Sequence, residues 1–331
     1  MVNAYIKDIS FYVPDEIITN DDLSAMMDTS DEWISTRTGI KTRHSVGNSN
    51  LGPADLAVKA TEKLLTKLDI SKEEIDFVVF ATSTPDYFIP GSGTVFQYKM
   101  GLNNIGVLDI RQGCSGFVYA LSVANQYVKS GTYKNVLVIG AEVQTTQLDY
   151  DDAGRGTSII FGDGAAACLV SCTKDSKGIL STHLHSDGEY IDELSTKYPS
   201  SKYKDIITND NIKAREHHIH MNGREVFKHA VKRFPEVIIE GLDYNNLTAD
   251  DLKIVIPHQA NFRITQAVQK KLGVSEEKVF SNIQKYGNTT AASVGIALAE
   301  ALDEDRIEDG DIVVLAAFGA GFYWGAVVIK W

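Results

Sequence analysis

Cysteine is scarce in this chain of 331 residues, which contains only Cys114, Cys168 and Cys172. Their odd number excludes a complete set of intramolecular disulfides, and their spacing is not that of a metal site. The first residues also lack a basic segment followed by an apolar one, so we predict no export signal. Both absences favour a cytoplasmic protein with reduced thiols. Cys168 and Cys172 lie in an apolar run and are predicted to be core residues.

Basic side chains are in deficit. The 32 lysines and arginines are outnumbered by 44 aspartates and glutamates, which gives a formal net charge of −12. This charge argues against nonspecific binding to nucleic acid or to an anionic membrane. Any polyanionic partner must therefore meet a local basic patch.

Uncharged runs of membrane-spanning length are also rare. Residues 312–329 form one, "IVVLAAFGAGFYWGAVVI", but Gly319, Gly321 and Gly325 interrupt it. Its ends are rich in β-branched residues, which favours two buried strands joined by a tight turn. We therefore predict no membrane segment here.

No low-complexity linker divides the chain, and its 44% hydrophobic content is ample for a buried core. Strand-like and helix-like segments alternate, which predicts an α/β protein with helices covering its sheets. Strands are predicted at 77–81, 105–110, 135–140, 253–256 and 312–316. Helices are predicted at 53–68, 115–129, 226–240, 260–272 and 290–302.

A faint internal repeat relates the two halves. "SKEEIDFVVF" from Ser71 and "TADDLKIVIP" from Thr248 share a capping-box start before an apolar strand. Nearly the same separation along the chain relates Gly101 to Gly273, and Cys114 to Asn288. These similar offsets predict two related halves meeting near residue 175. Cys114 and Asn288, each before a predicted helix, would then occupy equivalent helix starts.

Cys114 stands in "DIRQGCSGFVYAL", between a predicted strand and the first turn of a predicted helix. A lone cysteine is commonly a small core residue. At the start of a buried helix, however, a thiol faces unpaired N–H groups and the positive end of the helix dipole, which favour the thiolate. We therefore interpret Cys114 as a nucleophile.

His258 follows the apolar strand of "KIVIPHQAN", and Asn288 precedes a helix in "KYGNTTAAS". Taken singly, the histidine could be an ordinary loop residue and the asparagine a helix N-cap. Both nevertheless lie at junctions between strands and helices, where α/β proteins gather their sites.

Two further patterns carry weaker signals. "GDGAAA" at 162–167 matches a dinucleotide fingerprint but leads into a strand-like segment, so we predict no dinucleotide site. His217, His218 and His220 could bind zinc, yet no cysteine or second zinc motif accompanies them, and solvated or hydrogen-bonded histidines are favoured.

The motifs as a set resemble those of the β-ketoacyl-acyl-carrier-protein synthases III, within the thiolase superfamily. The resemblance extends over the whole chain through "DTSDEWISTRTGIKTRH", "GCSGF", "RGTSIIFGDGAA", "MNGREVFK", "PHQANFRI", "KYGNTTAASVGIAL" and "AFGAGFYWG". It implies an α/β thiolase-like fold in which two pseudo-duplicated βαβαβ-type halves pack in α-β-α-β-α layers. We place these halves at 1–174, carrying the cysteine, and 175–331, carrying the histidine and asparagine.

The resemblance implies decarboxylative condensation by a Cys-His-Asn triad of Cys114, His258 and Asn288. Cys114 would take an acyl group from acyl-CoA, and the other two would stabilise the enolate formed from malonyl-acyl carrier protein. Backbone N–H groups of Cys114 and Ala320 would bind the second oxyanion. The family usually has glycine where this chain has Ala320.

The family pattern also implies binding surfaces and partners. CoA is a substrate, and no metal or other cofactor is implied; a homodimer is expected. CoA binding is assigned to Thr29, Trp33, Arg37, Arg155, Phe227 and Asn261. The acyl pocket is assigned to Ile89 and Phe318, with the loop "DYFIPGSG" reaching across the dimer interface. Carrier-protein docking is assigned to Arg263, Lys270, Lys271 and Lys228.

Related reactions remain as alternatives. A thiolase needs a second cysteine late in the chain, and none follows Cys172; hydroxymethylglutaryl-CoA synthase has a catalytic glutamate where Ser83 stands here. Both are disfavoured. The loop around Ile89 looks one residue longer than in acetyl-specific members, which is compatible with a longer or branched primer or with a specialised pathway.

Overall fold

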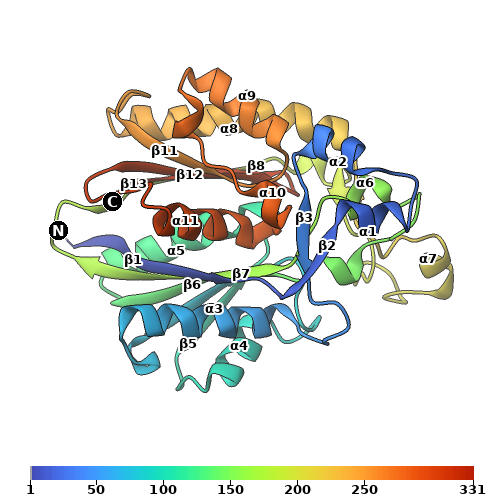
Figure 1. The fold of residues 1–331 in the computed structure, drawn as a ribbon. Coiled ribbons are helices and arrows are strands. Elements are labelled where there is room, and N and C mark those ends of the chain that lie inside the picture. Colours follow the sequence, from blue (N-terminus) through green and yellow to red (C-terminus); the bar gives the residue numbers. More distant parts are fainter. Residues whose placement is uncertain (1) are drawn as a thin grey trace.

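The computed structural model describes residues 2–331, which form two β-sheets stacked between layers of helices (Figure 1). The first sheet has five strands in the order β1-β7-β6-β4-β5. These are β1 (Asn3–Tyr12), β7 (Gly164–Thr173), β6 (Asn135–Glu142), β4 (Phe77–Ala81) and β5 (Gly106–Ile110). β4 runs parallel to both β5 and β6, whereas β7 is antiparallel to its neighbours β6 and β1.

The second sheet repeats this order with four strands, β11-β12-β13-β8. They are β11 (Leu252–Pro257), β12 (Ile312–Gly319), β13 (Tyr323–Lys330) and β8 (Gly178–Ser186). β11 is parallel to β12, and the remaining pairs are antiparallel. An isolated parallel bridge between Val255 and Val279 stands where the first sheet has its fifth strand. The pseudo-duplication predicted from the repeat is confirmed.

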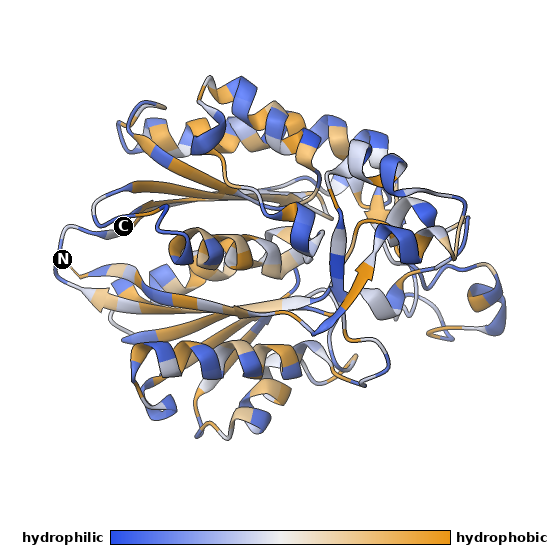
Figure 2. Cartoon of the chain, viewed as in Figure 1, coloured by the Kyte–Doolittle hydropathy of each residue, from blue (hydrophilic) through white to orange (hydrophobic). Residues whose placement is uncertain are grey.

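The helices complete five layers. α5 (Gly116–Lys129) and α11 (Ser293–Asp303) lie between the two sheets (Figure 1). α3 (Pro53–Leu68) and α4 (Ser92–Met100) cover the outer face of the first sheet, and α8 (Gly223–Tyr244) and α9 (Phe262–Leu272) cover that of the second. Figure 2 shows apolar colouring concentrated on the sheets and central helices, with polar residues along the outer helices. The predicted α-β-α-β-α layering is confirmed.

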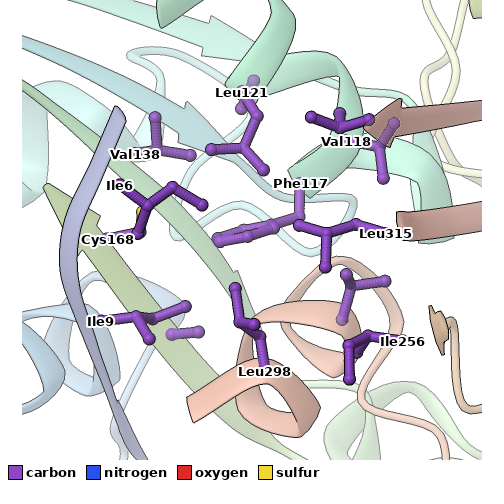
Figure 3. Close-up of a cluster of buried hydrophobic side chains, with 14 of the residues drawn as sticks. Ile6, Ile9, Phe117, Val118, Leu121, Val138, Cys168, Ile256, Leu298 and Leu315 are labelled. Atoms are coloured by element: carbon purple, nitrogen blue, oxygen red, sulfur yellow. The ribbon is translucent and has the colours of Figure 1, made fainter. Parts of the chain in front are cut away.

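The central helices make the core continuous between the sheets. Phe117 of α5 is fully buried and lies between Leu298 of α11 and side chains from both sheets (Figure 3). Ile6 and Cys168 approach from the first sheet and Leu315 from the second. The starts of α5 and α11 are therefore held in fixed positions by packing along their length.

Shorter elements gather at one end of the layers (Figure 1). They are β2 (Glu16–Thr19), α1 (Asn20–Ser24), α2 (Asp31–Thr38), β3 (Thr42–Ser45), α6 (Arg155–Ser158), β9 (Leu194–Ser195), α7 (Asn209–Lys213), β10 (His220–Met221) and α10 (Ile283–Tyr286). The starts of α5 and α11 point toward this end.

Residues 312–329 form the antiparallel pair β12 and β13, as predicted. No helix of residues 2–331 is long and apolar enough to cross a membrane. "GDGAAA" leads into strand β7 rather than a helix. The boundary that we predict at 174–175 lies between β7 and β8.

The prediction for Cys172 is wrong. Cys168 is fully buried in the middle of β7, but Cys172, one residue before the strand ends, is exposed. The unbroken apolar run ends at Val170, and the buried part of the strand ends one residue later, at Ser171.

Candidate active site

Cys114, His258 and Asn288 line one cavity of about 240 Å³. Cys114 lies in a 3₁₀ turn, Gly113–Ser115, immediately before α5. His258 follows the last residue of β11, and Asn288 lies between α10 and α11. Residues far apart in the sequence thus converge because the two central helices begin at the same end of the molecule.

The Cys114 thiol is protonated at neutral pH. Its side chain is 5% exposed, and burial, reinforced by the nearby Glu142 carboxyl, raises its pKa to about 12. A hydrogen bond from the Asn288 side chain acts in the opposite direction but does not balance burial. The expectation of a thiolate is therefore wrong for the unliganded protein. α5 begins only at Gly116, two residues beyond the cysteine.

The Asn288 side chain has a defined orientation. Its Oδ1 accepts a hydrogen bond from the backbone N–H of Thr290 at 2.8 Å, which leaves its amide N–H groups for the thiol. Its own backbone is paired on both sides, with N–H donating to Ile160 and C=O accepting from Gly162. Asn288 is therefore held from two directions before any ligand binds.

His258 is a neutral imidazole. It is 2% exposed, and burial lowers its pKa to about 3. Nδ1 hydrogen-bonds the hydroxyl of Ser293, whose oxygen also accepts from the backbone N–H of Gln259 at 3.4 Å. In the tautomer that carries the ring proton on Nε2, the Ser293 hydroxyl donates to Nδ1. This tautomer can donate a hydrogen bond into the cavity.

The turn after β12 passes directly beside Cys114. A Cβ atom at Gly319 would lie 2.7 Å from the Cys114 Cβ and 2.9 Å from its backbone nitrogen, so only glycine permits this approach. Gly113 in turn faces Ala320, since a Cβ at position 113 would lie 3.3 Å from the Ala320 methyl and 3.5 Å from its nitrogen. The backbones of Cys114 and Ala320 are thus close neighbours, as an oxyanion site requires.

The outer end of the cavity carries an aromatic and cationic group of side chains. The guanidinium of Arg37 lies over the Trp33 ring, 4.3 Å from its centroid, and that of Arg155 lies at 5.2 Å. Both Trp33 and Arg37 line the cavity. Arg155 also hydrogen-bonds the backbone oxygen of Asp28. Next to Asp28, the Thr29 hydroxyl is buried and has no hydrogen-bond partner among residues 2–331.

Three other predicted residues line the same cavity. Phe227 of α8 is 38% exposed at the entrance, and Phe318 of β12 is buried. Asn261 caps α9 by accepting from the N–H of Arg263, and its amide donates to the backbone oxygen of Arg37 at 3.1 Å. The first cavity therefore extends from the Trp33 and Arg37 pair to the thiol.

A second cavity, of about 750 Å³, also reaches Cys114. Cys114, Phe161 and Leu194 line both cavities and mark where they meet. Within a single chain Ile89 lines neither of the two: it is 81% exposed, although the adjacent Phe88 lines the second. Phe318, the other predicted acyl-pocket residue, belongs to the first cavity rather than the second.

The predicted docking residues lie on two packed helices, α8 and α9. Lys270 and Lys271 are exposed in the last turn of α9. Arg263, in its first turn, donates to the backbone oxygen of Thr36 at 2.9 Å. Lys228 of α8 pairs with Glu225 at 2.9 Å. Of these four cations, Arg263 and Lys228 already have partners within the chain.

The histidine cluster is divided. The rings of His217 and His218 are tilted by 39° with centroids 4.0 Å apart and line the second cavity, whereas His220 is exposed on β10. The Nδ1 of His218 donates to the backbone oxygen of Gln147 at 2.8 Å. Across residues 2–331, no group of three or more His, Cys, Asp or Glu side chains is arranged to hold a metal ion.

The sequence analysis missed three polar residues of the site. Glu142 is fully buried at the end of β6 and influences the thiol, Ser293 orients His258, and Gln144 lines the second cavity. Glu142 could have been found as a charged residue ending the apolar strand "NVLVIGAE". The other two carry no signal, since serine and glutamine are common at such positions.

Comparisons with known proteins agree with this geometry. Residues 108–188 match the family model of 3-oxoacyl-[acyl-carrier-protein (ACP)] synthase III, and residues 242–331 match the model of its C-terminal part. The beta-ketoacyl-[acyl-carrier-protein] synthase III of Clostridioides difficile is 44% identical over 328 residues, covering 99% of this chain and 98% of that protein.

Solved structures extend the comparison to the fold. The 3-oxoacyl-[acyl-carrier-protein] synthase III of Aquifex aeolicus is 40% identical, with a TM-score of 0.90 over 99% of this chain and 100% of that one. The priming β-ketosynthase from the R1128 polyketide biosynthetic pathway is 29% identical, with a TM-score of 0.90 over 99% and 96%.

Proposed function

Because this chain belongs to the 3-oxoacyl-[acyl-carrier-protein] synthase III family, we propose that it condenses an acyl-CoA primer with malonyl-acyl carrier protein, through an acyl-Cys114 intermediate. The chain is an acyltransferase of the condensing type, and the reaction initiates fatty acid synthesis. The observation that carries the proposal is the convergence of Cys114, His258 and Asn288 on one cavity whose outer end holds Trp33 and Arg37.

The first step is transfer of the acyl group to the thiol. The Cys114 sulfur attacks the thioester carbonyl, and the bond from that carbonyl to the CoA sulfur breaks. Cys114 loses one proton, and the departing CoA thiolate gains one. The amide of Asn288 hydrogen-bonds the sulfur as negative charge develops on it. This bond lowers the pKa of the thiol and so offsets part of the increase that burial causes.

The second step is decarboxylation of the malonyl thioester. The bond to the carboxylate breaks, CO₂ leaves, and the electron pair forms an enolate. Its oxygen accepts hydrogen bonds from the Nε2–H of His258 and from the Asn288 amide. A neutral histidine suits this role, and both the buried position of His258 and its bond to Ser293 favour the neutral Nε2–H form.

The enolate carbon then attacks the acyl-Cys114 carbonyl. The oxyanion that forms lies between the backbone N–H groups of Cys114 and Ala320, whose close approach depends on Gly319. Collapse of this intermediate releases the β-ketoacyl product and returns the cysteine. The Ala320 methyl is accommodated because residue 113 has no side chain.

The substrates are held outside the reacting centre. Thr29, Trp33, Arg37 and Arg155 bind the nucleotide part of CoA, and Phe227 and Asn261 line the path of its pantetheine arm. The two guanidiniums supply the hydrogen bonds and positive charge that a nucleotide phosphate needs. The carrier protein docks on α8 and α9 near Arg263, Lys270, Lys271 and Lys228.

Two chains form a homodimer through the edge of the first sheet. β5 is an edge strand paired only with β4, and beside it Tyr98 is 86% exposed and Ile89 81% exposed. An unpaired strand edge with apolar neighbours is a favourable surface for a second copy. Light scattering after gel filtration tests this part: a mass of one chain at micromolar concentration would contradict it.

Intact-mass analysis tests the reaction. The protein is mixed with acetyl-CoA and a panel of longer acyl-CoAs, and a mass increase equal to the acyl group is expected, mapped to Cys114. Malonyl-acyl carrier protein added next should remove the adduct and release CO₂. If no acyl-CoA modifies Cys114, or if the adduct survives malonyl-acyl carrier protein, the proposed function is wrong.

A further inference from the structure

The wall of the second cavity carries several polar side chains. Beside Cys114 its wall includes Gln144, Thr290 and Ser83. Elsewhere in this wall, Ser195 Oγ and His217 Nδ1 are buried and have no hydrogen-bond partner among residues 2–331. A purely alkyl primer would displace solvent from the accessible polar groups of this wall without replacing its hydrogen bonds.

The orientation of Gln144 is fixed by a buried carboxyl group. Glu142 accepts hydrogen bonds from the hydroxyls of Ser83, at 2.9 Å, of Thr84, at 2.6 Å, and of Thr290. The hydroxyl protons of Ser83 and Thr290 therefore point toward Glu142. Toward Gln144 the two hydroxyls can only accept, and its Nε2 donates to them at 3.3 and 3.5 Å.

This arrangement leaves the Gln144 carbonyl oxygen unused. Both hydroxyls next to Gln144 take its N–H groups, so exchanging the amide nitrogen and oxygen would turn the oxygen toward two acceptors. In the part of the chain that the structure describes, nothing donates to Oε1. The side chain is 4% exposed yet lines the cavity, so Oε1 is a fixed acceptor on the cavity wall.

The acceptor lies close to the reacting thiol. Gln144 contacts the Thr290 hydroxyl, Thr290 N–H donates to Asn288, and Asn288 hydrogen-bonds Cys114. An acyl group on Cys114 that enters the second cavity therefore shares it with Gln144. The cavity of about 750 Å³ is far larger than an acetyl group requires and falls in the range of sites for drug-sized ligands.

We propose that Cys114 accepts a hydroxyacyl primer, whose hydroxyl donates a hydrogen bond to Oε1 of Gln144. This inference rests on the proposed acyl transfer from CoA and names the class of acyl group. Gln144 is a specificity-determining residue that contacts the substrate, while Glu142, Ser83 and Thr290 position it.

Pairs of isosteric acyl-CoAs test the proposal. The 3-hydroxybutyryl group differs from isovaleryl only by a hydroxyl in place of a methyl, and 4-hydroxybutyryl differs from valeryl in the same way. For at least one pair we expect kcat/KM for acylation of Cys114 to favour the hydroxyacyl member by about tenfold or more, because a site built to bond a hydroxyl rejects its apolar isostere.

Two variants test whether Gln144 causes the preference for a hydroxyacyl primer. Gln144→Met keeps the length of the side chain but removes the acceptor. In the preferred pair, the kcat/KM of the hydroxyacyl-CoA divided by that of its alkyl isostere should then fall close to one. Gln126→Met makes the same change on an exposed residue of α5 outside both cavities and should leave the ratio unchanged.

The outcomes separate this inference from the proposed function. Efficient acylation by isovaleryl-CoA and valeryl-CoA without any preference for a hydroxyacyl partner would overturn the hydroxyacyl inference alone. A preference that persists in Gln144→Met would overturn the role of Gln144. No acylation by any member of the panel would overturn the inference together with the condensing function.

Discussion

Gly113 and Ala320 face each other across the reacting thiol: a Cβ at position 113 would lie 3.3 Å from the Ala320 methyl. Gly113 also has a positive φ of 50°, so a side chain there meets both backbone strain and a neighbour. The methyl of Ala320 and the missing side chain of Gly113 therefore form one complementary pair beside the backbone N–H groups that we assign to the oxyanion.

Gly113→Ala is expected to slow condensation because the added methyl pushes Ala320 and its N–H away from the oxyanion position. Gly113→Ala with Ala320→Gly should recover part of the lost kcat/KM. Gly131→Ala is the matched control: φ is 74° but nothing lies within 4 Å of the added atom, so it should reduce stability with little effect on activity. Equal activity losses in the double and single variants would contradict the pairing.

The two half-reactions should separate by mutation. Cys114→Ala removes the nucleophile, so acyl transfer should be lost while malonyl-acyl carrier protein still releases CO₂. Asn288→Ala and His258→Ala remove donors to the enolate and should each lower decarboxylation about a hundredfold or more, as loss of an oxyanion donor does. Radiolabelled CO₂ release measures this step directly. Normal decarboxylation by Asn288→Ala would refute the assigned enolate site.

Alkylation of Cys114 should depend steeply on pH. With a pKa raised to about 12, its thiolate fraction grows about tenfold per pH unit, so the iodoacetamide rate should still be rising above about pH 10.5, where free cysteine is almost fully ionised. The measurement uses Cys172→Ser, which removes the exposed thiol. Bound acyl-CoA should protect Cys114, and a plateau below about pH 10.5 would contradict the raised pKa.

His258 should make the protein sensitive to acid. Its pKa falls from an ordinary value of about 6.5 to about 3, so below pH 6.5 the unfolded chain binds a proton that the folded chain does not bind. This contribution to stability is complete above pH 6.5 and decreases as the pH falls toward 3, by up to about 1.4 kcal/mol per pH unit.

Urea unfolding at pH 7.0 and 5.5 measures that loss. His258→Gln should lose less stability over the interval than the unmodified chain, because no imidazole is then left to titrate at this site. An identical loss in both proteins would show that His258 is not the group responsible.

Much of the fold follows from local sequence pattern. The ranges predicted for α3 and β4 agree with the structure, because Pro53 starts the helix and a continuous apolar run defines the buried strand. The convergence of Cys114 with Asn288 followed from the repeat. The ionisation of Cys114 did not, because burial depends on the packing of both sheets around the turn, and local pattern contains no measure of desolvation.

The second cavity was also beyond local pattern. Its wall combines Ser83 and Gln144 from the first half with Thr290 from the second, and their hydrogen-bond directions depend on Glu142, the last residue of β6. Ile89 could be placed in a loop from sequence, but its large exposure appears only when the fold is assembled.

The acyl carrier protein, which the family resemblance leads us to expect to be strongly acidic, must approach a chain of net charge −12. Lys270 and Lys271 are exposed at the end of α9, on a helix that begins near His258. Charge reversal here should raise KM for malonyl-acyl carrier protein, more strongly at low salt, because the attraction is screened as ionic strength increases. KM for acyl-CoA should change little.

Two double variants make this test specific. Lys270→Glu with Lys271→Glu is preferred to a change at Arg263, because Arg263 also bonds Thr36 next to the CoA cavity, and its loss would disturb both substrates.

Lys134→Glu with Lys174→Glu changes the net charge equally at the other end of the first sheet, before β6 and after β7. If steady-state kinetics at two ionic strengths show the same KM change in both double variants, overall charge rather than α9 governs the encounter. A carrier-specific change confined to the α9 variant is the result that docking on this helix requires.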